Sequence, residues 1–179
     1  RREEPVHTEP QRRQRTKHNK LVVSIVVDNS SSLSAQRAQL LKDALEMFNQ
    51  KILSSDISSD LDYAVYGFDG FSPRVIKEYN GPLEINRFDG GGIQVLGKAI
   101  EQAMDDLVER QKQYASHSVE THKPWLIILS DGDAYGDLQP VADRLKKIVK
   151  GKKITFFPFS LSSYDTVDAH GSKVLFALS

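Results

Sequence analysis

The chain has 179 residues, of which 39% are hydrophobic, and its 24 basic residues balance 24 acidic ones. This length and apolar content suit one α/β domain with a tail. Cysteine is absent, which excludes a disulfide framework and a thiolate site and fits a reducing, cytoplasmic compartment. No apolar run is long enough to span a bilayer, and no signal peptide is recognisable in the sequence. We therefore expect no membrane partner.

The first twenty residues differ in composition from the rest. Residues 1–20 carry seven Lys or Arg and three Glu, contain Pro5 and Pro10, and lack periodicity. We interpret them as a flexible charged linker. The alternative, a basic arm for nucleic acid, is less favoured because the glutamates interrupt the positive charge. Because the chain begins with Arg1 rather than Met, we expect it to be part of a larger chain or complex.

Residues 21–179 alternate segments typical of strands and helices. Strands are predicted at residues 21–27, 61–68, 74–79, 124–130 and 153–159, the third being short and polar as at a sheet edge. Apolar residues at helical spacing predict three helices: Leu41, Ala44, Leu45, Phe48 and Ile52; Leu96, Ala99, Ile100, Ala103, Met104 and Leu107; and Leu138, Val141, Leu145 and Ile148. Ser32 or Ser34 can cap the first helix. Residues 82–88 are predicted as a connection, residues 111–123 as a polar loop, and residues 174–178 as the start of a last helix.

This alternation predicts one α/β domain over residues 21–179, truncated at its last helix. Strands that alternate with helices form βαβ units with right-handed crossovers. We expect a Rossmann-like, doubly wound, mostly parallel sheet with one antiparallel edge strand and helices on both faces.

The first strand ends in a loop with oxygen side chains at alternate positions. Asp28, Ser30 and Ser32 directly follow the apolar run 21–27. Ligands of open α/β sheets bind beyond the carboxyl ends of the strands, and Mg²⁺ prefers clustered oxygens. The other interpretation is a helix cap. The apolar run 125–130 delivers Asp131 in the same way, and this second acidic strand end favours a metal site.

These motifs resemble the von Willebrand factor type A (VWA) domain and its metal-ion-dependent adhesion site. The resemblance rests on D-x-S-x-S at Asp28–Ser32 and on Ser130-Asp131-Gly132, and it covers residues 21–159. It implies that Asp28, Ser30 and Ser32 bind Mg²⁺ (or Mn²⁺, with Ca²⁺ less favoured) and that Asp131 binds directly or through water. Residues 124–132 are similar to the bacterial tellurium-resistance branch, which implies a cytoplasmic scaffold in a stress response.

The third element of that adhesion site departs from the family pattern. The family has a threonine after a glycine-rich loop, whereas this chain reads Gly91-Gly92-Ile93-Gln94-Val95-Leu96-Gly97. Alignment on the first glycines places Ile93 at the threonine position, and alignment on Leu96-Gly97 places Gln94 there. Ile93 has no ligand atom, whereas the amide oxygen of Gln94 can coordinate the ion or hold a water.

We therefore expect a non-enzymatic, divalent-metal-dependent protein-interaction module. An open metal position would accept an Asp or Glu carboxylate from a partner protein. One alternative is a degenerate scaffold that binds no metal, which Ile93 favours. The other is a nucleotide hydrolase, because residues 92–98 spell G-x-x-x-x-G-K. Ala99 stands where that loop needs Ser or Thr, which argues against it.

Overall fold

The computed structural model describes residues 19–29, 33–69, 72–89, 95–130 and 138–161. Five strands in these ranges form one sheet in the order β3-β2-β1-β4-β5. They are β1 (Leu21–Val27), β2 (Leu61–Asp69), β3 (Ser72–Lys77), β4 (Trp125–Ser130) and β5 (Thr155–Ser160). The edge strand β3 is antiparallel to β2, and all other neighbours are parallel. The predicted sheet is confirmed.

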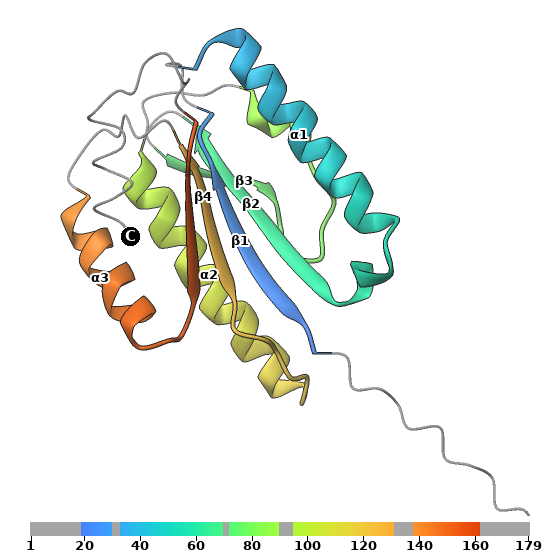
Figure 1. Ribbon diagram of the computed structural model, residues 1–179, viewed down its shortest axis with the longest axis vertical. Helices are drawn as coiled ribbons and strands as arrows, with labels where there is room; N and C mark the ends of the chain where they lie inside the picture. Colours follow the sequence, from blue (N-terminus) through green and yellow to red (C-terminus); the bar gives the residue numbers. More distant parts are fainter. Residues whose placement is uncertain (1–18, 30–32, 70–71, 90–94, 131–137, 162–179) are drawn as a thin grey trace, which may run out of the picture.

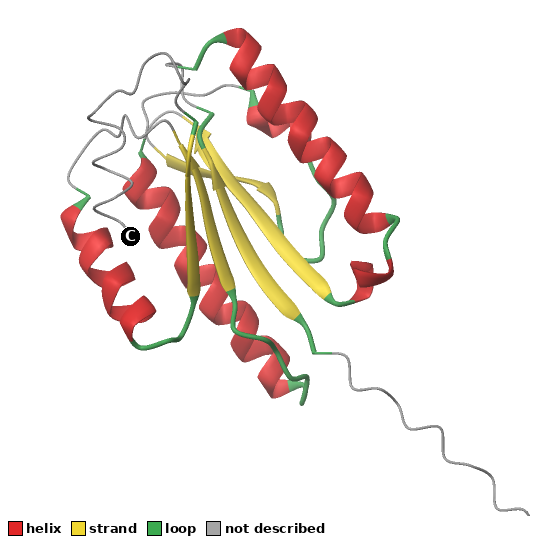
Figure 2. Cartoon of the chain, viewed as in Figure 1, coloured by secondary structure: helices red, strands yellow, loops and turns green. Residues whose placement is uncertain are grey.

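Three α-helices cover the two faces of this sheet. Helix α1 (Ala35–Leu53) lies on one face, and α2 (Leu96–Ser116) and α3 (Gln139–Lys150) lie on the other (Figures 1 and 2). Two short 3-10 helices, η1 (Asp56–Ser59) and η2 (Ile85–Phe88), lie in the connections. The fold is thus the expected Rossmann-like α/β class. None of the helices within the described ranges has the length and apolar character needed to cross a membrane.

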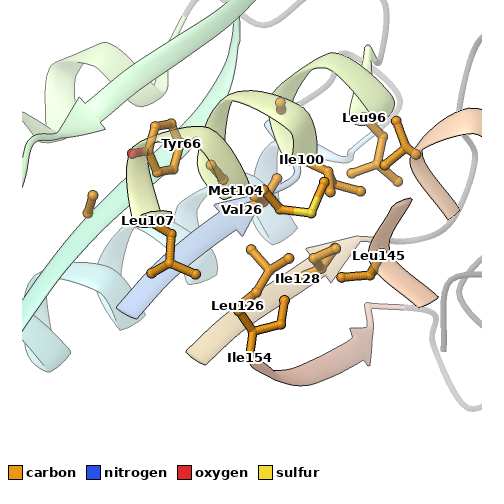
Figure 3. Close-up of a cluster of buried hydrophobic side chains, with 14 of the residues drawn as sticks. Val26, Tyr66, Leu96, Ile100, Met104, Leu107, Leu126, Ile128, Leu145 and Ile154 are labelled. Carbon is orange, nitrogen blue, oxygen red and sulfur yellow. The ribbon is translucent and has the colours of Figure 1, made fainter. Parts of the chain in front are cut away.

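The larger hydrophobic core lies between the sheet and helices α2 and α3 (Figure 3). All six apolar residues that predicted α2 are buried there. They pack on one side of β1 and β4, represented by Val26, Leu126 and Ile128. Burying a Leu or Ile side chain contributes about 1.5–3 kcal/mol, so this side of the sheet accounts for much of the stability.

Helix α1 begins where Ser34 caps it, with the Ser34 hydroxyl accepting a hydrogen bond from the backbone N–H of Arg37 at 3.3 Å. Its apolar row packs less deeply than the sequence predicts. Leu45 is the only buried residue of α1, whereas Phe48 is 38% exposed and Ala44 is exposed. The helical spacing places these residues on one apolar side of α1. Among the described residues, only part of that side packs against the sheet.

Several predicted boundaries were wrong: β3 begins at Ser72 rather than at residue 74, and β5 begins at Thr155 rather than at residue 153. The polar loop expected from residue 111 is helical as far as Ser116, because Arg110 and Tyr114 are anchored to Asp62 of β2 at one end of the helix. Strand β3 ends at Lys77 rather than at residue 79. A turn follows there, in which the Gly81 N–H donates to the Glu78 carbonyl at 3.1 Å.

Candidate metal centre at the carboxyl edge of the sheet

The parallel pairing of β1 and β4 brings their carboxyl ends side by side. Val27 pairs with Leu129, and the backbone N–H of Asp28 donates to the Leu129 carbonyl at 2.8 Å. The Ser130 hydroxyl donates to Oδ2 of Asp28 at 3.3 Å. Both side chains are completely buried. A carboxylate and a hydroxyl from two distant parts of the chain therefore meet at this edge.

Of the predicted metal ligands, the structure describes Asp28. The other four, Ser30, Ser32, Gln94 and Asp131, lie outside the described residues, so their positions stay predictions. Asp131 directly follows Ser130, and Ser30 follows Asp28 by two residues. Within the described ranges, no group of three or more His, Asp or Glu side chains could hold a metal.

The chemistry of Asp28 fits a ligand for a hard divalent cation. A buried carboxylate is costly unless its charge is compensated and its oxygens are hydrogen-bonded. The Ser130 hydroxyl orients the carboxylate, as hydrogen-bond partners of metal ligands do. Carboxylate and hydroxyl oxygens are the donors that Mg²⁺ takes in proteins. The described part of the edge thus supplies one oriented anionic ligand.

The residue beside Asp28 fixes the start of this loop. Asn29 is 5% exposed, and its amide nitrogen donates to the carbonyls of Phe68 and Phe88, both at 2.9 Å. Its amide oxygen accepts from the Phe68 N–H at 2.7 Å. A Cβ added at Gly67 would lie 2.9 Å from that oxygen, so glycine permits the close approach. We call these three hydrogen bonds the Asn29 clamp. The sequence did not predict it, because Asn29 occupies an unspecified position of the D-x-S-x-S motif.

A polar residue within β1, Ser24, also escaped prediction. Its side chain is completely buried in a strand whose other residues are all apolar. Its hydroxyl donates to the carbonyl of Ala103 in α2 at 2.9 Å and lies 2.6 Å from the Tyr79 hydroxyl. Nearby, the Tyr66 hydroxyl donates to Asp106 at 2.9 Å. These hydrogen bonds fasten α2 to the sheet.

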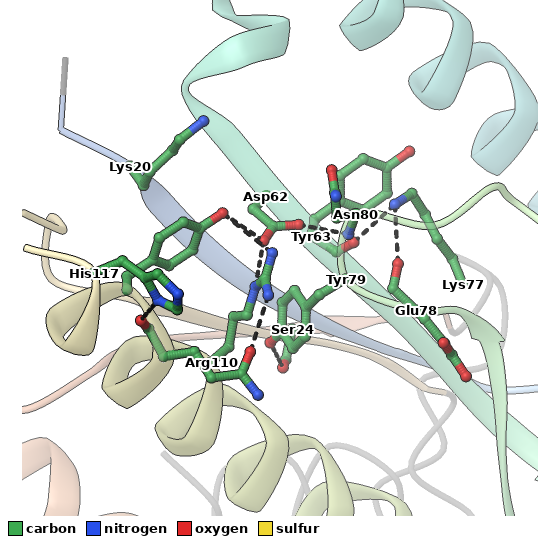
Figure 4. A network of polar contacts seen from close by, with 12 residues as sticks. Lys20, Ser24, Asp62, Tyr63, Lys77, Glu78, Tyr79, Asn80, Arg110 and His117 are labelled. Atoms are coloured by element: carbon green, nitrogen blue, oxygen red, sulfur yellow. Dashed lines mark hydrogen bonds and ion pairs between the residues drawn. The ribbon is translucent and has the colours of Figure 1, made fainter. Parts of the chain in front are cut away.

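A larger polar network lies at the opposite end of the sheet, around Asp62 (Figure 4). Asp62 is 6% exposed and accepts from Arg110 Nε at 2.7 Å, from the Tyr114 hydroxyl at 2.8 Å and from the Asn80 N–H at 2.8 Å. The φ angle of Asn80 is 57°, a left-handed conformation that Asn tolerates. Because three donors of the protein already occupy the Asp62 carboxylate, we assign this network a structural role rather than a ligand-binding one.

Lys77 is buried beside this network. Its ammonium group donates to the carbonyls of Tyr63 at 3.0 Å and Glu78 at 3.2 Å, and it lies 4.2 Å from the centre of the Tyr63 ring. Burial lowers the pKa of Lys77, and the charge of Asp62 opposes that shift. Two carbonyls and an aromatic face replace the water that the ammonium group loses, so Lys77 also has a structural role.

Four of the six tyrosines should resist alkaline ionisation in the folded protein. Burial raises the pKa of Tyr63 to about 12 and also raises the pKa values of Tyr66, Tyr79 and Tyr114. A tyrosine whose pKa is raised in the folded state stabilises the fold at pH values below its unfolded-state pKa of 10.0. This stabilisation is lost as the pH rises from 10.0 through the folded-state pKa. Lys77 opposes this trend, because the cost of its buried charge is relieved as it deprotonates.

The measurement is a titration of tyrosinate absorbance with far-ultraviolet circular dichroism recorded in parallel. We expect these four tyrosines to ionise above pH 10, together with the loss of helical signal. Ionisation of all six near pH 10.0 in a chain that keeps its native circular dichroism would contradict the buried geometry.

The described part of the phosphate-loop-like segment lies in a helix rather than in a loop. Gly97 and Lys98 lie in the first turn of α2, and the helix preceding them is η2 rather than a strand. A Cβ added at Gly97 would lie 3.1 Å from Leu138, so this glycine permits α2 and α3 to pack closely. Its presence has a packing explanation.

A mixed five-stranded sheet with helices on both faces defines a VWA-like α/β fold. Similar solved structures include the VWA domain of SpRpn10 (16% identity, TM-score 0.54), which covers 89% of this chain and 82% of that one. The mussel byssus protein PTMP1 (14%, TM-score 0.53) matches over 78% of this chain and 37% of its own. The pilus adhesin SpaC of Lactobacillus rhamnosus GG (16%, TM-score 0.52) matches over 65% and 15%. No protein-family model and no curated protein matches the sequence. These identities show a shared fold.

Proposed function

We propose that this chain is a divalent-metal-dependent protein-interaction module. The ion is Mg²⁺ or Mn²⁺, and its ligands are Asp28, Ser30, Ser32, Asp131 and Gln94. The observation that carries the proposal is the buried Asp28 carboxylate, which the Ser130 hydroxyl orients where the ends of β1 and β4 meet. Because ligands of open α/β sheets bind at this edge, a metal there is accessible to a partner.

The proposed interaction follows from the charges of the ligands. Two carboxylates and neutral oxygens leave a divalent ion electrophilic, so an Asp or Glu of a partner protein is an appropriate further ligand. Such a contact is stronger where water is excluded. Asp28 supplies charge, Ser130 orients it and Asn29 fixes the loop. No step of bond cleavage is part of this proposal, and we propose no enzymatic activity.

The fold similarity supports an interaction role, because one of the similar structures is a pilus adhesin. The finer proposal of a cytoplasmic scaffold in a bacterial stress response of the tellurium-resistance type rests on residues 124–132 alone.

The test is thermal unfolding of the EDTA-treated chain with and without Mg²⁺, Mn²⁺ or Ca²⁺. A metal that binds only the folded state stabilises it by about 2.7 kcal/mol at a hundredfold excess over its dissociation constant. We expect Mg²⁺ and Mn²⁺ to raise the unfolding temperature of the native chain. Asp28→Asn should abolish this metal-induced rise.

Because Asp28 is buried, its variant can be less stable for reasons unrelated to metal. Ser32→Ala is therefore measured beside it, and Asp43→Ala, which removes an exposed carboxylate of α1, is the matched control. The compared quantity is the rise caused by metal within each variant. No rise in the native chain for any of the ions would refute the metal site and leave a degenerate scaffold as the function.

A further inference from the structure

The end of helix α3 and the turn that follows it carry a dense group of lysines. Five of the eight residues between Leu145 and Ile154 are lysine, and none of the eight is acidic. We call these five residues the α3 lysine cluster: Lys146, Lys147, Lys150, Lys152 and Lys153. All five are exposed. Within the part of the chain that the structure describes, none of their side chains forms an ion pair.

The three lysines within the helix share its solvent side. Lys150 follows Lys146 by four residues and Lys147 by three, spacings that place side chains next to one another on a helix. The opposite side of α3 is apolar and buried in the core, with Val141, Ala142 and Leu145. The ammonium groups therefore point away from the sheet and lie close together.

The helix dipole accounts for only part of this cluster. Cations stabilise the last turn of a helix, which applies to Lys147 and Lys150 because α3 ends at Lys150. Lys152 lies beyond the helix, and its φ angle is 54°. This left-handed conformation is costly for a residue with a long side chain, whereas the adjacent Gly151 has an ordinary φ of −71°. A lysine rather than a glycine at the strained position favours a role for its charge.

Backbone hydrogen bonds fix where this turn holds its lysines. The Lys152 N–H donates to the Val149 carbonyl at 2.9 Å, and the Lys153 N–H donates to the Ile148 carbonyl at 3.1 Å. Both lysines therefore stay beside the last turn of α3 and extend the positive charge of the helical lysines. The cluster lies where β5 begins (Figure 1), whereas the candidate metal centre lies at the carboxyl edge of the sheet.

The charges around the cluster limit the kind of anion that fits it. Outside the cluster, residues 21–179 contain 12 basic and 21 acidic residues. The neighbouring helix α2 exposes a row of carboxylates at i, i+4 spacing, those of Glu101, Asp105 and Glu109. Asp105 pairs with Arg144 of α3, so this row borders the cluster. A long, rigid polyanion such as duplex nucleic acid would extend over these carboxylates and be repelled, whereas a short, flexible anion can stay on the lysines.

Two other polyanions also fit less well than an acidic peptide. A helix that binds a membrane surface inserts its apolar side, but the apolar side of α3 is already buried against the sheet. Single-stranded nucleic acid is bound by stacking its bases on aromatic side chains, and there is no aromatic residue between Leu145 and Ile154. A run of carboxylates needs only the exposed ammonium groups that the cluster supplies.

We propose that the α3 lysine cluster binds an acidic segment of a partner protein, that is, a short run of Asp and Glu residues. Its ammonium groups pair with the carboxylates of that segment. This interaction goes beyond the proposed metal-dependent function, because it needs no metal and uses the opposite edge of the sheet.

The probe is a fluorescein-labelled peptide of about eight alternating Glu and Asp residues, which spans about 26 Å when extended. Its binding to the chain is followed by fluorescence anisotropy at low ionic strength, with EDTA present. EDTA keeps divalent metal out of the measurement, so the result does not depend on the metal site. Lys146→Gln combined with Lys150→Gln and Lys153→Gln should raise the dissociation constant about fivefold or more, because three charge pairs are lost. Added salt should weaken binding to the native chain.

The matched control removes three exposed lysines outside the cluster, so that the net charge of the two variants is the same. It combines Lys51→Gln, Lys98→Gln and Lys112→Gln and should change the dissociation constant by less than about twofold. Equal weakening in the two variants would show that net charge alone attracts the peptide and would refute the proposal. The absence of binding to the native chain would also refute it.

Lys152 permits a test that separates charge from backbone conformation. Lys152→Gly suits the left-handed conformation, so it should not lower the unfolding temperature, but it should weaken peptide binding about twofold. Lys152→Arg keeps the charge and should bind the peptide as the native chain does. A Lys152→Gly chain that bound as tightly as the native chain would contradict the proposal.

Two further probes test the commitment to a protein partner. They are a duplex DNA of about twenty base pairs and vesicles of phosphatidylcholine with phosphatidylserine. We expect both to bind the native chain more weakly than the peptide does. Tighter binding of either probe, lost in the variant that lacks the three cluster lysines, would overturn the proposal in favour of nucleic acid or a membrane.

Discussion

Replacing Asp62 with alanine is expected to lower the free energy of unfolding by about 3 kcal/mol, because it leaves buried donors without an acceptor. The Asp62 carboxylate accepts from Arg110, Tyr114 and Asn80 at 2.7–2.8 Å and is 6% exposed. It joins β2 to the far end of α2 and to the turn after β3. Removing it therefore loosens three elements at once.

The measurement is chemical denaturation of Asp62→Ala beside two controls. Asp62→Asn keeps an acceptor of the same shape without the charge and should lose less stability than Asp62→Ala. Asp105→Ala removes a pair with Arg144 in which both side chains are exposed, and exposed pairs contribute only about 0–1 kcal/mol. A loss for Asp62→Ala no larger than that for Asp105→Ala would show that the network does not hold the fold.

The sequence predicted best the elements in which the spacing of apolar residues within the element itself identifies the helix or strand. In α2, six apolar residues recur at helical spacing, and all six are buried. In β1, a run that is apolar except for Ser24 indicated a strand covered on both sides, and the structure places it at the centre of the sheet. In both cases the period of the pattern and the geometry of the element agree, so no distant residue is needed to interpret them.

The residues that sequence analysis missed depend on partners far away in the chain. Ser24 bonds to a carbonyl 79 residues away, and Asn29 bonds to carbonyls 39 and 59 residues away. Asp62 finds Arg110 after 48 residues. No local period encodes such pairs. A polar residue inside or next to an apolar strand is the one available signal, because burial obliges it to find a partner.

The same distinction applies to the candidate metal site. Strand-end motifs proposed a set of ligand oxygens at this edge, of which the structure describes that of Asp28. The register of β1 and β4 brings Asp28 to Ser130, which was not among the predicted ligands. The motifs did not predict what holds Asp28 in place, since that task falls to Asn29, the residue that the motif leaves unspecified. The candidate ligands could be proposed from local motifs, whereas the contacts that hold Asp28 in place are tertiary and could not.

Asn29→Ala is expected to lower the free energy of unfolding by about 2–4 kcal/mol, because it leaves the Phe68 N–H and two carbonyls without their partners. All three hydrogen bonds are buried and measure 2.7–2.9 Å. They tie the residue after β1 to the end of β2 and to η2. Because Asn29 adjoins Asp28, the variant should also diminish the stabilisation that Mg²⁺ gives to the native chain.

Denaturation curves of Asn29→Ala and Asn29→Asp, each with and without Mg²⁺, separate the two effects. Asn29→Asp keeps an acceptor for the Phe68 N–H but loses the two hydrogen bonds that the amide nitrogen donates. We therefore expect this variant also to have a lower free energy of unfolding than the native chain. Gln39→Ala removes an exposed side-chain hydrogen bond to Asp43 on α1 and serves as the control, with an effect within about 0.5 kcal/mol. If Asn29→Ala lowered stability but left the Mg²⁺ effect intact, Asn29 would support the sheet without positioning Asp28. If Asn29→Ala changed neither the stability nor the Mg²⁺ effect, the Asn29 clamp would make no contribution to the fold, because breaking three buried hydrogen bonds that stabilise it must lower the free energy of unfolding.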